Sequence, residues 1–208
     1  MLIDFHSHHP APYSVICNAD ASGPARSTAL LRCAGLLPNL WTEERQQRLF
    51  DLLEAESDLQ MGEIGLDRRF ENLLPMNRQA EILRQELSFA LEHGRCISLH
   101  CVHATGLMLD ILKKLDFRPY SILWHGFTGS PETANELKKL NILLLVGPRF
   151  RGDVKQLLTV NPFIAPETDY EGSDDTEHQE ILLKQYLRFP ENYEEKATKI
   201  FSLFSTGC

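Results

Sequence analysis

The chain has 208 residues, of which 43% are hydrophobic and 24% charged, with a formal net charge of −8. This composition is typical of a globular protein with a sizeable core, and the negative charge argues against a general basic surface for nucleic acid. We find no apolar run of the roughly 18 residues that a membrane span needs and no signal-peptide pattern, so we expect no membrane partner. Five scattered cysteines without a Cys-x-x-Cys pair favour a reducing, cytoplasmic location.

Strand and helix patterns follow one another along the chain. Runs of apolar and β-branched residues predict eight strands, at 1–5, 13–17, 27–34, 59–66, 96–101, 120–124, 141–146 and 163–165. Helical periodicity and capping residues, among them Thr42, Ser130 and a proline at 75, predict the helices between and after them, at 42–57, 75–93, 105–115, from 130, 153–160, 177–187 and 193–204.

This alternation predicts the fold class. Strands separated by helices pair in parallel, and eight of them predict an α/β fold, a (β/α)8 TIM barrel. No helix fits between the first two strands, and roughly 250 residues are usual for a barrel, so we expect the first units to be distorted and trimmed. A barrel of this size forms one unit, and we expect a single domain over residues 1–208.

Metal-ligating side chains recur where the predicted strands end. His6 and His8 lie two residues apart in extended chain, so both imidazoles face one side. In such barrels the active site lies at the carboxyl ends of the strands. The candidates at this rim are His6, His8, Glu63, His100, His125 and Asp169. Four imidazoles and two carboxylates suit two divalent ions bridged by a carboxylate.

Each candidate also has a structural interpretation when taken alone. A strand-end histidine such as His100 is commonly a hydrogen-bonded rim residue, and a lone Asp169 caps a loop. Glu63 is a costly buried charge unless it is paired or bound to metal. His93 and His178 are predicted to be helical and solvent-facing. His9 and His103 stay open, and His103 has a spacing that can face the pocket.

The sequence resembles the TatD family of metal-dependent hydrolases, within the amidohydrolase-like barrel superfamily. The motifs that carry this resemblance are DFHSH at 4–8, GEIGLD at 62–67, SLHC at 98–101, HGFTGS at 125–130 and ETD at 167–169. The resemblance implies that His6, His8, Glu63 and Asp169 hold one ion. It implies that Glu63, His100 and His125 hold the second. The donors suit Zn, Mn or, less well, Mg.

Two positions depart from the family pattern. Leu37 occupies the place of a usual histidine, and His103 occupies the place of a usual arginine. A histidine does not replace the bidentate phosphate contacts of an arginine. Substrate contacts are therefore expected from His103 itself and from Arg68, with Arg69 next to it as a further phosphate contact.

The resemblance implies a divalent-metal-dependent hydrolase, a phosphodiesterase or deoxyribonuclease whose substrate is DNA or a small phosphodiester. Asp169 is expected to orient the attacking water or take its proton, and Glu63 to bridge the ions. Asp4 is expected to accept a hydrogen bond from a ligating ring, and Asp67 to position the loop after the fourth strand. Two alternatives stay open: an amide or ester (for example lactone) hydrolase, and a catalytically silent metal-binding relative.

Overall fold

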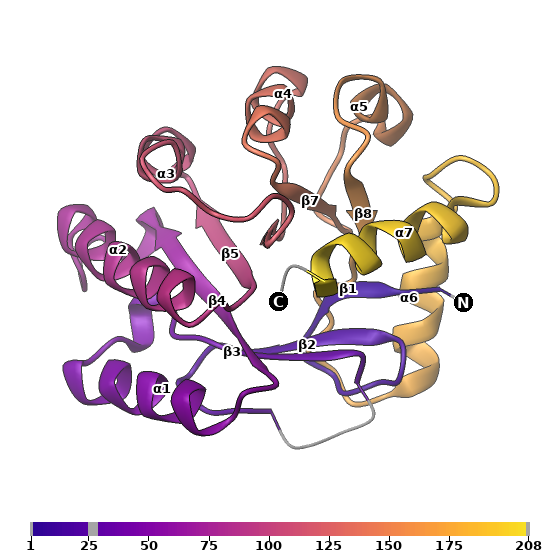
Figure 1. The fold of residues 1–208 in the computed structure, drawn as a ribbon. Helices are drawn as coiled ribbons and strands as arrows, with labels where there is room; N and C mark the ends of the chain where they lie inside the picture. The colour runs from indigo at the N-terminus through magenta and orange to yellow at the C-terminus, as the bar shows by residue number, and fades with distance from the viewer. Residues whose placement is uncertain (1, 25–28, 207–208) are drawn as a thin grey trace.

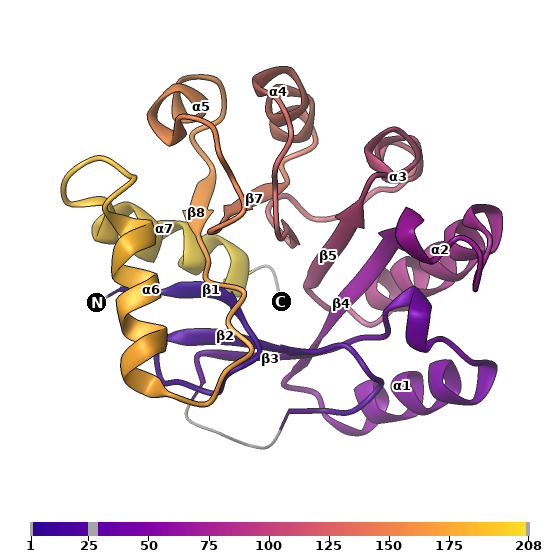
Figure 2. The same cartoon turned by 180° about the vertical axis from the view of Figure 1, so that it is seen from behind.

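The computed structural model describes residues 2–24 and 29–206. Its eight strands form one parallel sheet in the order of the sequence, with helices on the outside (Figures 1 and 2). The strands are β1 (Asp4–Ser7), β2 (Ser14–Asn18), β3 (Leu31–Ala34), β4 (Leu59–Asp67), β5 (Ile97–Val102), β6 (Ile122–Trp124), β7 (Leu143–Val146) and β8 (Ile164–Pro166). The predicted α/β fold, a (β/α)8 TIM barrel, is confirmed.

The barrel is completed by backbone hydrogen bonds between β1 and the chain just after β8. The amide of Asp169 donates to the carbonyl of His6 at 3.0 Å, and the amide of His8 donates to the carbonyl of Tyr170 at 2.9 Å. Asp169 has a positive φ of 53°, a conformation that Asp tolerates better than most residues. This turn brings the residues after β8 alongside those at the end of β1.

The helices begin where the sequence places capping residues. The Thr42 side chain accepts from the amide of Arg45, and Ser130 accepts from the amide of Thr133. The helices are α1 (Glu43–Ala55), α2 (Met76–Glu92), α3 (Thr105–Leu112), α4 (Pro131–Lys139), α5 (Val154–Val160), α6 (Asp175–Tyr186) and α7 (Tyr193–Thr206), with short 3-10 turns at Pro38–Leu40 and Arg68–Phe70. No helix in the described ranges is long and apolar enough to cross a membrane.

The first unit of the barrel is trimmed, as expected. Residues 8–13 connect β1 to β2 without a helix. Helix α7 lies across the end of the barrel where strands begin. The Tyr193 hydroxyl donates to the carbonyl of Ile164 at the start of β8, and the Phe204 carbonyl accepts from the Cys96 thiol just before β5. Every predicted strand overlaps an observed one, but β1 begins and ends later than predicted and β3 begins later than predicted. Of the residues predicted to lie in strands, Met1, Ser27 and Thr28 lie outside the described residues.

The β4 strand, which carries Glu63, packs unusually close to its neighbours. Gly62 and Gly65 have φ values of 151° and 156°, which favour glycine. A side-chain Cβ at Gly65 would overlap the carbonyl oxygen of His100, and one at Gly35 in the loop after β3 would overlap the backbone of Glu63. The β4–β5 register also shifts between Gly62 and Ile64. The glycines therefore let the backbones of β3, β4 and β5 approach and set the position of Glu63.

We expect Gly65→Ala to lower the free energy of unfolding by about 2–5 kcal/mol, because the added methyl group meets backbone and the φ is strained. Chemical denaturation monitored by circular dichroism measures this change. The matched control is Gly106→Ala in α3, where a Cβ meets no atom within 4 Å; it should stabilise the protein by up to about 1 kcal/mol. Equal stability of Gly65→Ala and the native protein would contradict the close approach.

Candidate metal centre

The rim at which the strands end gathers the predicted ligands. His6 lies in β1, Glu63 in β4 and His100 in β5, while His125 follows β6 and Asp169 lies beyond β8. Glu63 is 3% exposed and His6 is fully buried. A carboxylate this deeply buried is costly unless it is paired or bound to a cation, so its neighbours decide its chemistry.

One group of donors surrounds the amino-terminal histidines. Nε2 of His6 lies 3.6 Å from Oδ1 of Asp169, and Nε2 of His8 lies 3.5 Å from the same oxygen. Oε2 of Glu63 lies 3.6 Å from Nε2 of His6 and 3.8 Å from Nε2 of His8. These separations exceed hydrogen-bond lengths, as expected for atoms that face a common centre. His6, His8 and Asp169 form a group with metal-ligand spacing.

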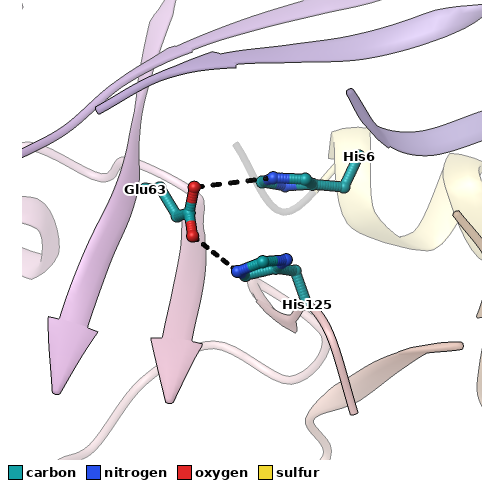
Figure 3. A group of neighbouring side chains, drawn as sticks. All are labelled: His6, Glu63 and His125. Carbon is teal, nitrogen blue, oxygen red and sulfur yellow. Dashed lines mark ion pairs between the residues drawn. The ribbon is translucent and has the colours of Figure 1, made fainter. Parts of the chain in front are cut away.

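A second group lies on the other side of the same carboxylate. Oε1 of Glu63 lies 2.6 Å from Nδ1 of His100 and 2.5 Å from Nε2 of His125. The two imidazole nitrogens are 3.1 Å apart. Figure 3 shows Glu63 between His6 and His125, with one carboxylate oxygen directed at each ring. Glu63 thus presents a separate oxygen to each donor group.

Polar partners hold the rings of His6 and His8 from behind. Nδ1 of His8 lies 2.8 Å from the carbonyl oxygen of Cys17, to which a ring N–H donates. Nδ1 of His6 lies 3.3 Å from Oγ of Ser98. Such contacts set the tautomer of a ligating histidine and leave its other nitrogen as the acceptor. In both residues that other nitrogen is Nε2, which faces Asp169.

Carboxylates stand behind the other two rings. Nε2 of His100 lies 3.0 Å from Oδ2 of Asp67, and Nδ1 of His125 lies 3.8 Å from Oε2 of Glu167. The second oxygen of Glu167 accepts from the amide of Gly126 at 2.7 Å. All four imidazoles therefore have a polar group behind them and turn one nitrogen toward the centre.

The charges of the site are strongly coupled. Burial raises the pKa of Glu63, but the charge of His125 and hydrogen bonds from His100 and His125 outweigh it and hold the pKa well below its usual range. Burial lowers the pKa of His125, which favours the neutral ring that binds metals. Burial likewise raises the pKa of Glu167, to about 8. Glu63 is thus an anion among imidazoles.

These residues fit a bound divalent metal. Nε2 of His6 is buried and has no hydrogen-bond partner among the described residues. An unpaired polar atom at this depth costs about 1–3 kcal/mol, which coordination relieves. Nitrogen and carboxylate donors together suit Zn, Mn, Fe or Co. The ligand set His6, His8, Glu63 and Asp169, with His100 and His125 beyond Glu63, stays our prediction.

We expect metal affinity to rise with pH up to about 9. Burial lowers the pKa of His100, but hydrogen bonds to Asp67 and Glu63 outweigh it and raise the pKa to about 9. Below that pH a metal must displace the proton from Nδ1, so affinity should rise up to about tenfold per pH unit and then level off. Calorimetric titration of metal-free protein with Mn²⁺ in buffers of different ionisation enthalpy measures the released protons. Asp67→Asn should weaken the pH dependence of metal affinity, because it removes a carboxylate that raises the pKa of His100. A metal affinity of the native protein that does not vary with pH would contradict this expectation.

The centre opens into a cavity of about 480 Å³. Leu37 is in its wall, at the position where the sequence departs from the family histidine. Arginines 69 and 149 also line it, from the turn after β4 and the loop after β7. The cavity thus combines the two donor groups with cationic side chains and one apolar wall residue.

Two of the three residues expected to contact substrate, His103 and Arg68, lie elsewhere. His103 is exposed, and its carbonyl oxygen accepts from Nε of Arg68 at 3.0 Å. Arg68 is half exposed and pairs with Glu71 at 3.2 Å. Neither is among the residues that line the cavity, whereas Arg69, the neighbour of Arg68, is. The structure therefore does not bring His103 and Arg68 to the centre.

Two expectations, one about His178 and one about Asp4, are wrong. His178 does not face solvent: it is fully buried, and its Nε2 lies 2.6 Å from Oδ2 of Asp4. Asp4 accepts from the amide of Thr168 at 2.9 Å and from the amide of His6 at 3.3 Å, and from no ligating ring. Asp4 thus joins β1 to the chain after β8. The α6 pattern misplaced His178 because tertiary contacts cover that helix face.

Sequence reasoning also missed the hydrogen-bond and charge partners of the candidate ligands. For Asp67 the sequence predicts only a loop-positioning role, although strand alternation places it on the same side as Glu63, four residues earlier. Glu167 shares the ETD motif with Asp169, yet no local pattern marks it as the neighbour of His125. For Arg149 the sequence offers no signal, because a loop has no periodicity.

Comparisons with known proteins agree with this geometry. A family model described as TatD related DNase matches residues 19–158. The chain is 33% identical over 106 residues to the uncharacterized metal-dependent hydrolase YabD of Bacillus subtilis, covering 51% of this chain and 41% of the relative. It is 28% identical over 99 residues to the 3'-5' RNA nuclease TATDN2 of Homo sapiens, covering 48% and 13%. It is 35% identical over 91 residues to the 3'-5' ssDNA/RNA exonuclease TatD of Enterobacter lignolyticus, covering 43% and 34%. The chain therefore spans less than half the length of these curated relatives.

Solved structures share the fold over most of the chain. YJJV, a TatD homologue from Escherichia coli, aligns with a TM-score of 0.72 and 21% identity, covering 93% of this chain and 83% of that one. An uncharacterized amidohydrolase from Saccharomyces cerevisiae aligns with a TM-score of 0.62 and 17% identity, covering 90% and 75%. With the family match over more than half of the residues, the chain belongs to the TatD-related DNase family of metal-dependent hydrolases.

Proposed function

We propose that this protein is a two-metal phosphodiesterase that cleaves nucleic acid, with DNA ends as the substrate expected from the sequence. The observation that carries the proposal is the division of Glu63: one oxygen faces His6 and His8, and the other faces His100 and His125. A bridging carboxylate between two donor groups is typical of two-metal hydrolytic sites. Two relatives named as nucleases support the substrate class.

In this proposal His6, His8, Asp169 and Glu63 hold one ion, and Glu63, His100 and His125 hold the other. Zn²⁺, Mn²⁺ or Mg²⁺, when bound, supplies an acidified water and Lewis-acid stabilisation of the charge on the phosphoryl oxygens. The burial of His125 and the partners behind His8 and His100 would hold these donors in position for the ions.

Asp169 is the residue we assign to the water. Its Oδ1 faces the imidazoles of His6 and His8, and its Oδ2 faces the open cavity beside Arg149. Burial raises the pKa of Asp169, but the imidazole of His8, 3.5 Å away, and the nearby rings of His6 and His125 hold it below its usual range. Asp169 is therefore ionised and able to accept the proton of the attacking water. The water oxygen would bond to phosphorus as the P–O ester bond breaks, and the proton that Asp169 accepts from the water would pass to the departing ester oxygen.

The test uses metal-free protein titrated with Mn²⁺, Zn²⁺ and Mg²⁺. Release of nitrophenolate from an aryl phosphodiester measures the chemistry, and end-labelled single-stranded DNA and RNA measure the substrate class. Metal-dependent cleavage of the phosphodiester is the expected result. Turnover of an aryl ester or lactone without phosphodiester cleavage would move the assignment to an amide or ester hydrolase. Metal binding without turnover of any substrate would indicate a catalytically silent relative.

A further inference from the structure

Two arginines reach the cavity over the centre from well-separated strands. Arg69 lies in the turn that follows β4, and Arg149 lies in the loop that follows β7. Three strand steps separate β4 from β7 in an eight-stranded sheet, so the two side chains enter from different walls. Both are well exposed, with 57% and 66% of the side chain accessible.

Each arginine is anchored by a carboxylate that also contacts an imidazole of the centre. Nη2 of Arg69 lies 2.5 Å from Oδ2 of Asp67, whose same oxygen is 3.0 Å from His100. Nη2 of Arg149 lies 2.7 Å from Oδ2 of Asp169. The contact with a carboxylate orders each arginine side chain before a ligand binds. Less side-chain entropy is therefore lost on binding than for a free, exposed arginine.

Both guanidinium groups keep donors available. Arg69 uses Nε and Nη2 on Asp67, and Arg149 uses Nη2 on Asp169. Nη1 of Arg69, and Nε and Nη1 of Arg149, have no hydrogen-bond partner in the described part of the chain. A guanidinium carries five N–H donors in a fork that matches phosphate oxygens.

The two arginines are the cationic side chains of the cavity lining, histidines aside, so they favour an anionic substrate over a neutral one. The other charged residues in its lining, histidines aside, are the carboxylates Glu63, Asp169 and Glu171. A neutral substrate gains little from two arginines here, whereas a phosphodiester would meet two charge-assisted forks in addition to any ions that the centre holds.

We propose that Arg69 and Arg149 form a phosphate clamp, one on each side of the metal centre, that supplies the anion contacts absent at His103. This inference rests on the proposed function for its choice of phosphate. The alternative role is purely positional: the arginines hold Asp67 and Asp169, and through them the metal ligands. The two roles predict different losses when the arginines are removed.

The test compares Arg69→Gln, Arg149→Gln and the double variant with the native protein. Calorimetry of Mn²⁺-loaded protein with inorganic phosphate and with a 5'-phosphorylated dinucleotide measures anion binding, and Mn²⁺ titration of metal-free protein measures metal affinity. Each single variant should weaken anion binding about 10- to 100-fold, because a charge-assisted contact is lost, and change Mn²⁺ affinity less than about threefold. Arg149→Lys should restore part of the loss, since it keeps the charge without the fork.

The matched control is Arg151→Gln, which removes the same charge from the same loop at an exposed residue that does not line this cavity. It should leave anion and metal binding unchanged. Unchanged anion binding in the double variant, or no phosphate binding by the native protein, overturns the clamp. Loss of metal affinity with anion affinity retained assigns the positional role instead. If anion binding depends on both arginines but no phosphodiester is cleaved, the nuclease proposal alone is contradicted. If the variants cleave phosphodiester and bind anions with normal affinity, the clamp alone is contradicted.

Discussion

Glu63→Gln is expected to lower metal-dependent kcat by on the order of 10³-fold while the fold persists. The amide is nearly isosteric but neutral, and only one of its two polar atoms can coordinate, so one of the two donor groups loses its shared ligand. Lewis-acid stabilisation contributes several kcal/mol to such a reaction, and each 1.36 kcal/mol is tenfold in rate. Steady-state turnover of an aryl phosphodiester, with Mn²⁺ stoichiometry by calorimetry, measures the loss.

The control for this substitution is Glu180→Gln on the exposed surface of α6, which makes the same chemical change at a residue with 66% of its side chain accessible. It should retain full activity. Circular dichroism should show the same secondary structure in both variants. Native turnover and two bound ions in Glu63→Gln would contradict the bridging role, because the site would then work without a carboxylate that faces both donor groups.

Asp169→Asn is expected to reduce kcat by about 10²- to 10⁴-fold, the range for loss of a general base. The amide oxygen can still face His6 and His8, but no atom is left to accept a proton from water. Since the pKa of Asp169 is held below its usual range, the native residue is ionised at every pH used for assay. Asparagine has no group that titrates in this range, so raising the pH should not restore the variant, and the loss should appear in kcat across the whole profile.

Asp175→Asn is the matched control. Asp175 has 73% of its side chain exposed and contacts His9 at 2.6 Å, outside the cavity. The activity of Asp175→Asn should equal that of the native protein. If Asp169→Asn kept native kcat with loaded metal, proton transfer would have to be assigned to another group, and Asp169 would remain only a ligand.

Much of the fold follows from local patterns. Alternating strands and helices predict the barrel, and the caps at Thr42 and Ser130 are confirmed. Strand side chains alternate and parallel strands end on one rim, so the spacing of His6 and His8 and the strand-end positions of His100 and His125 predict that these four rings lie together. Their distances to Glu63 agree with that reasoning.

Other features depend on residues far apart in the chain. His178 and Asp4 are 174 positions apart, and their 2.6 Å contact buries a helix residue that the sequence predicts to face solvent. Helical periodicity reports which residues share a face, and packing decides what covers that face. The same limit applies to Arg68 and Arg69, adjacent in sequence, of which only the second lines the cavity.

By itself, then, the sequence determined the order of strands and helices, the rim at which the candidate ligands gather and the family to which the chain belongs. These depend on periodicity of two and 3.6 residues and on short motifs, which are local. Only the tertiary structure decided that Glu63 divides its oxygens between two groups, that Asp67 and Glu167 stand behind the rings, and that Arg149 reaches Asp169. Those contacts join separate loops and strands, and their geometry is set by barrel closure and the close packing of β4.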